Sequence, residues 1–221
     1  MKHRQLSSRW SLVFRLLLAV LIFPTLQGCR PMMYPAARAF GGPKESELKR
    51  IRPAFAALKT QARVGAVVVY RPLVVKTGQP SWDDGAGTLL VEAMHQDLAP
   101  RATLAPDAPD VPFEPMGHNQ MRYLWKRARG YASWVGSRHP AGDYFVFTEL
   151  LTDEKGERVL GAQCYIVDAS GQIAHADLWN SHHYDPATFS GLGPFLDWMV
   201  RDLLKSLDND PSKQYPPYGV G

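Results

Sequence analysis

Two spacings of apolar residues recur along this chain and predict its secondary structure. Apolar residues return every three or four positions, as on one face of a helix, in segments 45–58, 88–100, 119–135 and 193–207. Runs typical of strands occupy 64–70, 101–104, 143–153, 158–168 and 172–181. The first run is apolar on both faces, as in a central strand, and glycine-bearing connectors join the last three. The order predicts an α/β fold: a single mixed sheet with a central strand, crossover helices, a C-terminal three-strand antiparallel meander and a closing amphipathic helix.

Local signals refine the expected helices. Pro53 weakens the first one, because proline lacks a backbone donor and crowds the preceding turn. Asn119 is suited to cap the third helix, whose side opposite the apolar stripe carries the basic residues Arg122, Lys126, Arg127 and Arg129. Such a run is typical of a solvated helix face, and the alternative is a surface for anionic lipid or for an acidic partner.

Two further short stretches have structural interpretations. The sequence GQPSW, residues 78–82, is typical of a turn, so Asp83 and Asp84 after it are expected to shape that turn or to start the next helix. Cys164 lies in a strand-like run whose alternation places it on one face with Leu160, Ala162 and Ile166. Because the sequence shows no basic partner for its thiol, we expect a small core residue rather than a nucleophile.

The amino terminus has the pattern of a secretory signal peptide. Four basic residues, Lys2, Arg4, Arg9 and Arg15, accompany a short apolar stretch, LLLAVLIFPTLQGC, that falls below the roughly 20 residues of a membrane span. Its last four residues resemble the lipobox of bacterial lipoproteins: Leu26, Gly28 and Cys29 match, and Gln27 stands where Ala or Ser is more usual. The resemblance implies diacylation of the Cys29 thiol with fatty acids such as palmitate, cleavage before Cys29, and acylation of the new amino terminus.

This interpretation divides the chain into four parts. Residues 1–28 form the expected signal peptide, 29–43 the lipidated cysteine and a flexible tether, 44–208 a periplasmic α/β domain, and 209–221 a disordered tail. The lipid on Cys29 is expected to hold the protein on a membrane. Arg30 follows that cysteine, where an Asp would resemble the inner-membrane retention signal of enteric bacteria. We therefore expect the periplasmic side of the outer membrane.

The charge balance argues against a nucleic-acid partner. The whole chain has 25 Lys and Arg against 21 Asp and Glu, but four of the basic residues lie in the leader. Cleavage leaves 21 of each sign, so the mature chain lacks the concentrated basic field that nucleic-acid binding requires.

The order of the expected elements resembles the periplasmic α/β domain of several envelope lipoproteins and the amino-terminal domain of the Tol-Pal translocation protein. The segments that carry this resemblance are VGAVVVYRP, LLVEAMHQDLA, and DYFVFTELLTD with RVLGAQCYIVDASGQIA, about a third of the chain. The curli-secretion lipoprotein and the lipoprotein activators of penicillin-binding proteins share the pattern. The resemblance implies a domain that binds partners or assembles, with no catalytic residues and no cofactor.

One cluster could carry metal chemistry. In HADLWNSHHYD, His175 and Asp177 share a face of a strand, and His182, His183 and Asp185 follow in a loop. Two imidazoles and a carboxylate can hold zinc and leave a position open for water. The alternative interpretation is a polar sheet face followed by a surface loop.

A proline ladder marks the stretch APDAPDVPFEP. Pro106, Pro109, Pro112 and Pro115 recur at every third residue, which is the period of a polyproline II helix and aligns them on one edge. The ladder is interpreted either as a structural connector or as a segment that a partner recognises. Replacing Pro109 and Pro112 is expected to leave the core untouched.

Three aromatic residues, Trp134, Trp179 and Tyr184, are expected on exposed faces, where they could extend a partner-binding surface from the ladder.

Three functional hypotheses follow from the sequence. The leading one is a non-enzymatic, lipid-anchored domain that binds an envelope protein or a cell-wall component. The others are a metal-dependent periplasmic enzyme that uses the His/Asp cluster, and a structural lipoprotein that assembles with itself.

Overall fold

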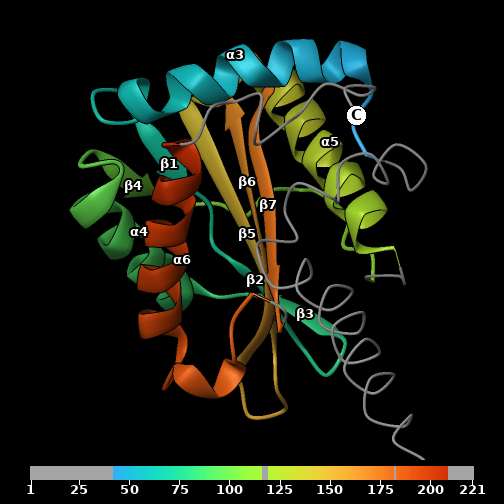
Figure 1. Cartoon of the computed structure of the whole chain (residues 1–221), viewed down its shortest axis with the longest axis vertical. Helices are drawn as coiled ribbons and strands as arrows, with labels where there is room; N and C mark the ends of the chain where they lie inside the picture. Colours follow the sequence, from blue (N-terminus) through green and yellow to red (C-terminus); the bar gives the residue numbers. More distant parts are fainter. Residues whose placement is uncertain (1–41, 116–118, 182, 209–221) are drawn as a thin grey trace, which may run out of the picture.

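The computed structural model describes residues 42–115, 119–181 and 183–208, so Cys29, the leader, most of the tether and the tail lie outside the described residues. The predicted fold class is confirmed, since four α-helices and one open mixed sheet of seven strands make up the described part (Figure 1). The helices are α3 (Glu45–Gln61), α4 (Asp84–Asp97), α5 (Gln120–Arg138) and α6 (Leu192–Leu207). The strands are β1 (Val67–Val69), β2 (Leu73–Lys76), β3 (Gln79–Trp82), β4 (Ala102–Leu104), β5 (Tyr144–Thr152), β6 (Val159–Asp168) and β7 (Ile173–Asn180).

The long strand β5 organises the sheet. Along one of its edges β1 and then β2 pair with it in parallel, Val67 opposite Tyr144 and Leu73 opposite Glu149. Beyond them, β4 runs parallel to β1 and β3 runs antiparallel to β2. Along the other edge β6 and β7 complete an antiparallel run, which confirms the expected meander. The apolar run 64–70 does supply an interior strand, but its first residue, Val64, is 68% exposed before the strand begins.

The hairpin β2–β3 was not expected, and the prediction of a turn over GQPSW is wrong. Thr77 and Gly78 form the two-residue turn that joins β2 to β3. Both residues have positive φ (49° and 78°), which is the conformation that matches the twist of a hairpin. Pro80 lies inside β3, which is tolerated because β3 forms an exposed edge of the sheet. Asp83 then starts α4 as expected, since its side chain accepts a hydrogen bond from the Ala86 backbone at 2.8 Å.

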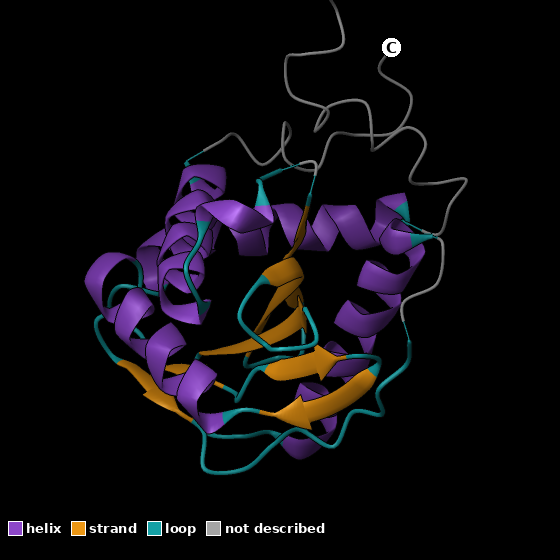
Figure 2. Cartoon of the chain, turned by 90° about the horizontal axis from the view of Figure 1, so that it is seen from below, coloured by secondary structure: helices purple, strands orange, loops and turns teal. Residues whose placement is uncertain are grey.

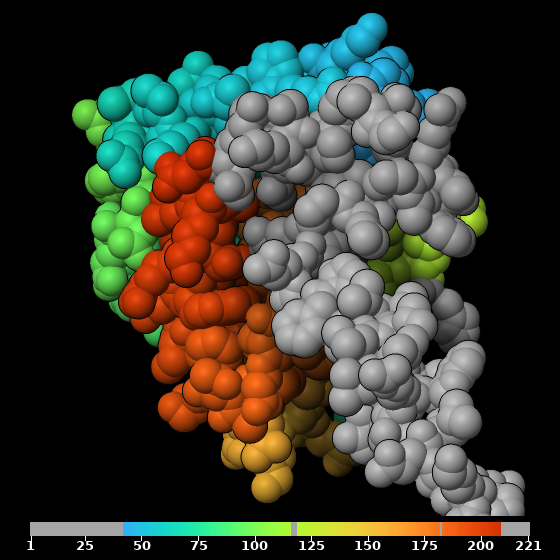
Figure 3. Space-filling view, in the orientation of Figure 1, coloured from blue at the N-terminus to red at the C-terminus, as the bar shows by residue number. Residues whose placement is uncertain are grey.

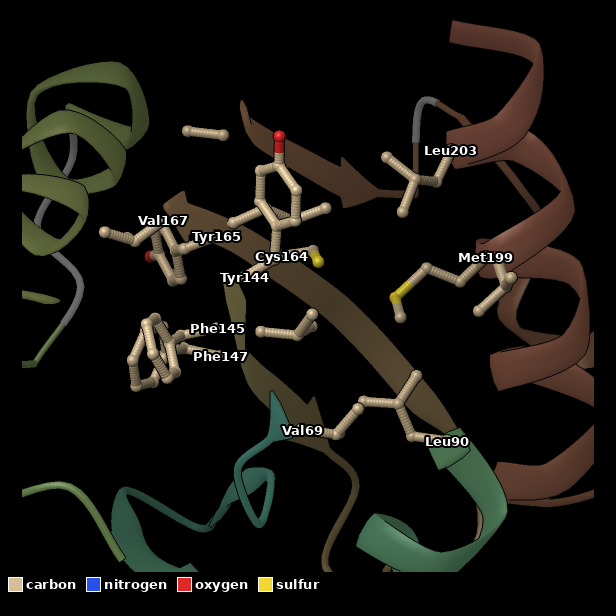
Figure 4. Close-up of a cluster of buried hydrophobic side chains, with 14 of the residues drawn as sticks. Val69, Leu90, Tyr144, Phe145, Phe147, Cys164, Tyr165, Val167, Met199 and Leu203 are labelled. Carbon is tan, nitrogen blue, oxygen red and sulfur yellow. The ribbon is translucent and has the colours of Figure 1, made fainter. Parts of the chain in front are cut away.

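Helices cover both faces of the sheet (Figure 2). On one side, α5 packs against β6 and β7, and Phe145 and Phe147 point toward it (Figure 4). On the other side, α4 packs against α6, and Met199 of α6 lies in the core opposite those rings (Figure 4). The helix α3 crosses one end of the sheet, where it contacts β7 and α6 (Figure 1). Side by side, α3, α4 and α6 form a continuous outer surface (Figure 3).

Cys164 lies in this core, as the sequence predicts. Its side chain is fully buried, and burial raises the pKa of the thiol to about 12, so the reactive thiolate is scarce at neutral pH. The prediction for its neighbour Leu160 is wrong: this side chain is 41% exposed, because the ladder between β5 and β6 is irregular at Leu151/Thr152.

Pro53 does not end α3. The helix continues to Gln61 because Leu48, Ile51, Phe55 and Leu58 are buried along one side and offset the missing hydrogen bond.

Among the residues that the structure describes, no helix is both long enough and apolar enough to cross a membrane.

A bidentate ion pair joins the start of α3 to α5. The Arg129 guanidinium donates to both carboxylate oxygens of Glu47, at 2.7 and 3.0 Å, and Glu47 also accepts from the Lys44 backbone at 2.8 Å. The hydrogen bond from Arg129 lowers the pKa of Glu47 against the opposing effect of burial. A carboxyl whose pKa is lower in the folded state stabilises the fold above its unfolded pKa, and this contribution is lost as the pH falls.

We therefore expect Glu47→Gln to lower the free energy of unfolding by up to about 1 kcal/mol at pH 7. The amide can still accept the Lys44 hydrogen bond, so the substitution isolates the charge. In urea titrations the difference from wild type should shrink toward zero between about pH 5 and pH 3. The exposed Glu92→Gln on α4 is the control, and a difference that does not change with pH would contradict a role for the charge.

Candidate functional site

Two members of the basic run on α5, Arg122 and Lys126, are exposed as expected, but the expectation of a solvated face is wrong for Arg127. Arg127 is 3% exposed and pairs with Glu149 of β5, which is also 3% exposed. The Arg127 Nε lies 2.6 Å from Glu149 Oε1, and Nη2 lies at the same distance. Two charges buried this deeply are costly unless each compensates the other, so the pair acts as a unit.

Tyrosine hydroxyls complete the hydrogen bonding of this carboxylate. Tyr131 donates to Glu149 Oε1 at 2.8 Å, and Tyr123 donates to Oε2 at 3.0 Å. Arg127 Nη2 also donates to the Tyr131 hydroxyl at 2.8 Å. Behind them, Tyr165 of β6 donates to Gln163 Oε1 at 3.3 Å. We call Tyr123, Arg127, Tyr131 and Glu149 the buried polar network.

Helix and strand periodicity place these groups together. Tyr123, Arg127 and Tyr131 are four residues apart and therefore lie on one face of α5. Glu149 and Gln163 are direct cross-strand neighbours on β5 and β6. Alternation along β5 puts Glu149 on the same face as Phe147, whose ring stacks on Tyr131 with centroids 4.3 Å apart.

The tyrosines of the network remain protonated. Burial, and then the charge of Glu149, raise the pKa of Tyr123 and of Tyr131 above the ordinary value. Both hydroxyls therefore stay neutral donors to the carboxylate. Because the guanidinium and two hydroxyls hold Glu149, the arrangement is suited to a fixed binding surface rather than to proton transfer.

A pocket of about 330 Å³ opens next to the network. Its polar lining consists of Tyr123, Glu149 and Gln163. The remaining walls come from β5, β6, the β2–β3 hairpin and the proline ladder, and are formed by Val75, Gly78, Phe113, Pro115, Leu150, Leu151 and Gly161. Apolar walls with a few convergent polar groups are typical of small-molecule sites.

The proline ladder forms part of this pocket and is held by arginines. Arg71 donates to the Pro106 carbonyl at 2.7 Å, and Arg127 donates to the Pro112 carbonyl. The four prolines do not share one environment, since Pro109 is buried whereas Pro106, Pro112 and Pro115 are exposed. Replacing Pro109 therefore does change a buried position, contrary to the sequence-based expectation.

The expected exposed aromatics are packing residues instead. Trp179 is 1% exposed, and its indole donates to Asp202 of α6 at 2.8 Å. Tyr184 is half-buried, donates to the Val159 carbonyl at 3.0 Å and contacts three other rings, those of Phe189, Phe195 and Trp198. Trp134 is half-buried with its ring edge-on to Tyr70. The prediction that these three side chains extend an exposed surface is wrong.

The His/Asp cluster is only partly assembled. His175 is fully buried against Phe55, and its Nε2 lies 3.9 Å from Asp177 Oδ2, so these two do share a face. His183 lies in the following turn with its Nδ1 3.1 Å from Asn180 Oδ1, and His182 lies outside the described residues. In the described part of the chain, no three His, Cys, Asp or Glu side chains are grouped so that they could hold a metal ion.

Sequence reasoning missed Glu149 and the pocket beside it. A detectable signal was present: YFVFTELLT has a single carboxylate among mostly apolar residues and two threonines, within a strand buried on both faces. Such a group requires a buried cation, and Arg127 on the preceding helix supplies it.

No protein-family model matches this chain, and no curated protein matches it. The candidate site is therefore defined by its own geometry: a buried, charge-compensated polar network that lines one side of a small apolar pocket.

Proposed function

We propose that this protein is a bacterial envelope lipoprotein, anchored through lipid on Cys29, whose folded domain binds a partner and catalyses no reaction. The lipobox residues Leu26, Gly28 and Cys29 support the anchor, and Arg30 supports the outer membrane. The domain then faces the periplasm, where an envelope protein or a cell-wall component is the proposed partner.

The observation that carries the binding half of the proposal is the pocket beneath the proline ladder. Phe113 and Pro115 form part of its wall, while carbonyl groups of the same segment are held by Arg71 in the β1–β2 connection and by Arg127 of α5. A wall that is already fixed in place loses little conformational entropy when a ligand binds. The Glu149 carboxylate in the same pocket is held by Arg127 and two tyrosines, which favours recognition over proton transfer.

The anchor is tested with Cys29→Ser, which removes the acylated thiol and keeps the apolar leader. We expect the precursor of this variant to persist uncleaved, whereas wild type should be shorter, carry lipid by mass spectrometry and fractionate with outer membranes. The matched control Gln27→Ser keeps the cysteine and should mature normally. A Cys29→Ser protein that reaches the mature size and still enters the detergent phase would contradict lipidation.

Binding is tested in the same envelopes by photocrosslinking. A photoreactive phenylalanine at position 113 should give a discrete adduct, because this ring lines the pocket. The same probe at Leu160, which is exposed outside the pocket, is the control. Equal labelling from both positions, or no adduct from position 113, would contradict a partner at the pocket.

A further inference from the structure

The charges beside the pocket cancel. Among the described residues of the lining, Glu149 alone carries a formal charge, and the Arg127 guanidinium 2.6 Å away compensates it. A cationic ligand would thus find no net negative charge, and an anionic ligand would meet the carboxylate. Because transferring an uncompensated charge out of water is costly, the pocket favours an uncharged ligand.

Where Glu149 and Tyr123 meet in the lining, the hydrogen-bonding capacity that remains is that of an acceptor. Among the described residues, Glu149 Oε2 accepts one hydrogen bond, from Tyr123, and a carboxylate oxygen can accept another. The Tyr123 hydroxyl donates its one hydrogen in that bond, and its oxygen can still accept a hydrogen bond from a ligand. Both residues line the pocket, and a ligand that donates one hydrogen bond would satisfy this corner.

The walls suit a flat ring. The rings of Phe113, Pro115 and Tyr123 line the pocket together with Val75 and Leu151. Aromatic groups gain from edge or offset contacts with such rings in addition to the area that they bury. The volume of about 330 Å³ is near the lower limit for small-molecule sites, which restricts the bound group to one or two rings.

We propose that this pocket binds an uncharged aromatic group with a single hydrogen-bond donor, a phenol or an indole, whose O–H or N–H points to Glu149 Oε2 and the Tyr123 oxygen. This inference rests on the proposed binding function and names the ligand class of the same site. The group can belong to a free small molecule or to a tyrosine or tryptophan side chain of a partner protein, and the chemistry that recognises it is the same.

The test uses the full-length protein in lipid nanodiscs, with empty nanodiscs as the blank. Four small aromatic probes of similar shape are compared. Isothermal titration calorimetry at pH 7 should give p-cresol a Kd on the order of 0.1 to 1 mM. We expect p-xylene, which lacks the donor, to bind about tenfold more weakly, because one hydrogen bond to a charged acceptor is lost. The cation 4-methylbenzylammonium and the anion 4-methylbenzoate should each bind at least about tenfold more weakly than p-cresol.

A variant that fills the pocket identifies the site. Gly161 lines it, and a Cβ there would meet neighbouring atoms only at 3.4 Å or more, so Gly161→Val should fold and weaken p-cresol binding at least about tenfold. Leu160→Val, at the adjacent exposed position, is the matched control and should bind as wild type does. If thermal melting shows that Gly161→Val is unfolded, Leu151→Gln on the partly exposed wall replaces it and should weaken binding about threefold.

The source of the aromatic group follows from a further titration. The ligand is a tripeptide that contains tyrosine and is blocked at both ends. If it binds as well as p-cresol, the aromatic group belongs to a partner protein. If it fails to bind where p-cresol binds, the group belongs to a free molecule. Equal binding of p-xylene and p-cresol, tighter binding of either charged probe, or unchanged binding by Gly161→Val would overturn the proposal. Failure of all four probes in a protein that is lipidated and crosslinks from position 113 would refute this ligand class and leave the proposed function standing.

Discussion

Replacing Arg127 with alanine is expected to lower the free energy of unfolding by about 3 to 5 kcal/mol. Arg127 compensates the buried charge of Glu149, and its removal leaves a carboxylate that is 3% exposed and that, within the described ranges, keeps the hydroxyls of Tyr123 and Tyr131 as its donors. The variant also loses the hydrogen bond from Arg127 to the Pro112 carbonyl, which holds the proline ladder over the pocket. Urea unfolding at pH 7 measures the loss, with an unchanged slope showing that two-state behaviour is retained.

Two further variants separate the charge from the packing. Arg122→Ala, at an exposed position on the same helix, should change the free energy of unfolding by less than about 0.5 kcal/mol. The double variant Arg127→Met with Glu149→Gln removes both charges and keeps an acceptor for the tyrosines, so it should recover at least half of the loss. A double variant no more stable than Arg127→Ala would mean that the guanidinium acts through packing.

Gly171→Ala is expected to lower the free energy of unfolding by about 2 to 4 kcal/mol. Gly171 ends the turn between β6 and β7 with φ of 78°, and its amide donates to the Asp168 carbonyl at 2.9 Å. A Cβ at this position would lie 2.9 Å from the Ala132 carbonyl oxygen and 2.9 Å from the Gly136 Cα. Both atoms belong to the backbone of α5, so the turn or the helix has to move.

Gly136 is the matched control because it faces Gly171 across the same contact. A Cβ on Gly136 would meet only ordinary contacts at 3.9 Å, and alanine favours the helix over glycine by up to about 1 kcal/mol. We therefore expect Gly136→Ala to raise the midpoint of thermal unfolding and Gly171→Ala to lower it. If both alanines shift the midpoint in the same direction, the close approach of this turn to α5 does not limit stability.

The place of the Arg127–Glu149 ion pair beside the pocket offers a reason for burying two charges there. A buried charge pair can be replaced by apolar residues at little cost in stability, so stability alone does not require one. Here Glu149 lines the pocket, Tyr123 donates to it, and Arg127 holds the carbonyl of Pro112 in the ladder, so the pair connects the groups around an apolar space. If the pair exists to shape that space, variants that remove both charges should remain folded and lose p-cresol binding.

The four helices, the meander and the core position of Cys164 could be predicted from the sequence because each depends on spacing within one segment, whereas the β2–β3 hairpin was missed. The period of 3.6 marks the buried side of α6, and alternation with glycine connectors marks β5 to β7. The N-caps Asp83 and Asn119 could also be predicted from nearby residues, since each side chain accepts a hydrogen bond from the backbone amide three residues later. The resemblance of residues 26–29 to a lipobox is also local, and it stays a prediction because these residues lie outside the described part of the chain.

What only the tertiary structure decided depends on contacts between distant segments. Arg127 has the spacing of a solvated residue, and only the placement of α5 over β5 brings it to Glu149, 22 residues away. Trp179 and Pro109 are buried because α6 and the rest of the domain cover positions that no local period marks. The sequence by itself therefore determined the four helices and the strands β1, β4 and β5 to β7. The β2–β3 hairpin and the pocket were decided by packing, because the free energy of a buried charge or ring depends on what surrounds it in space.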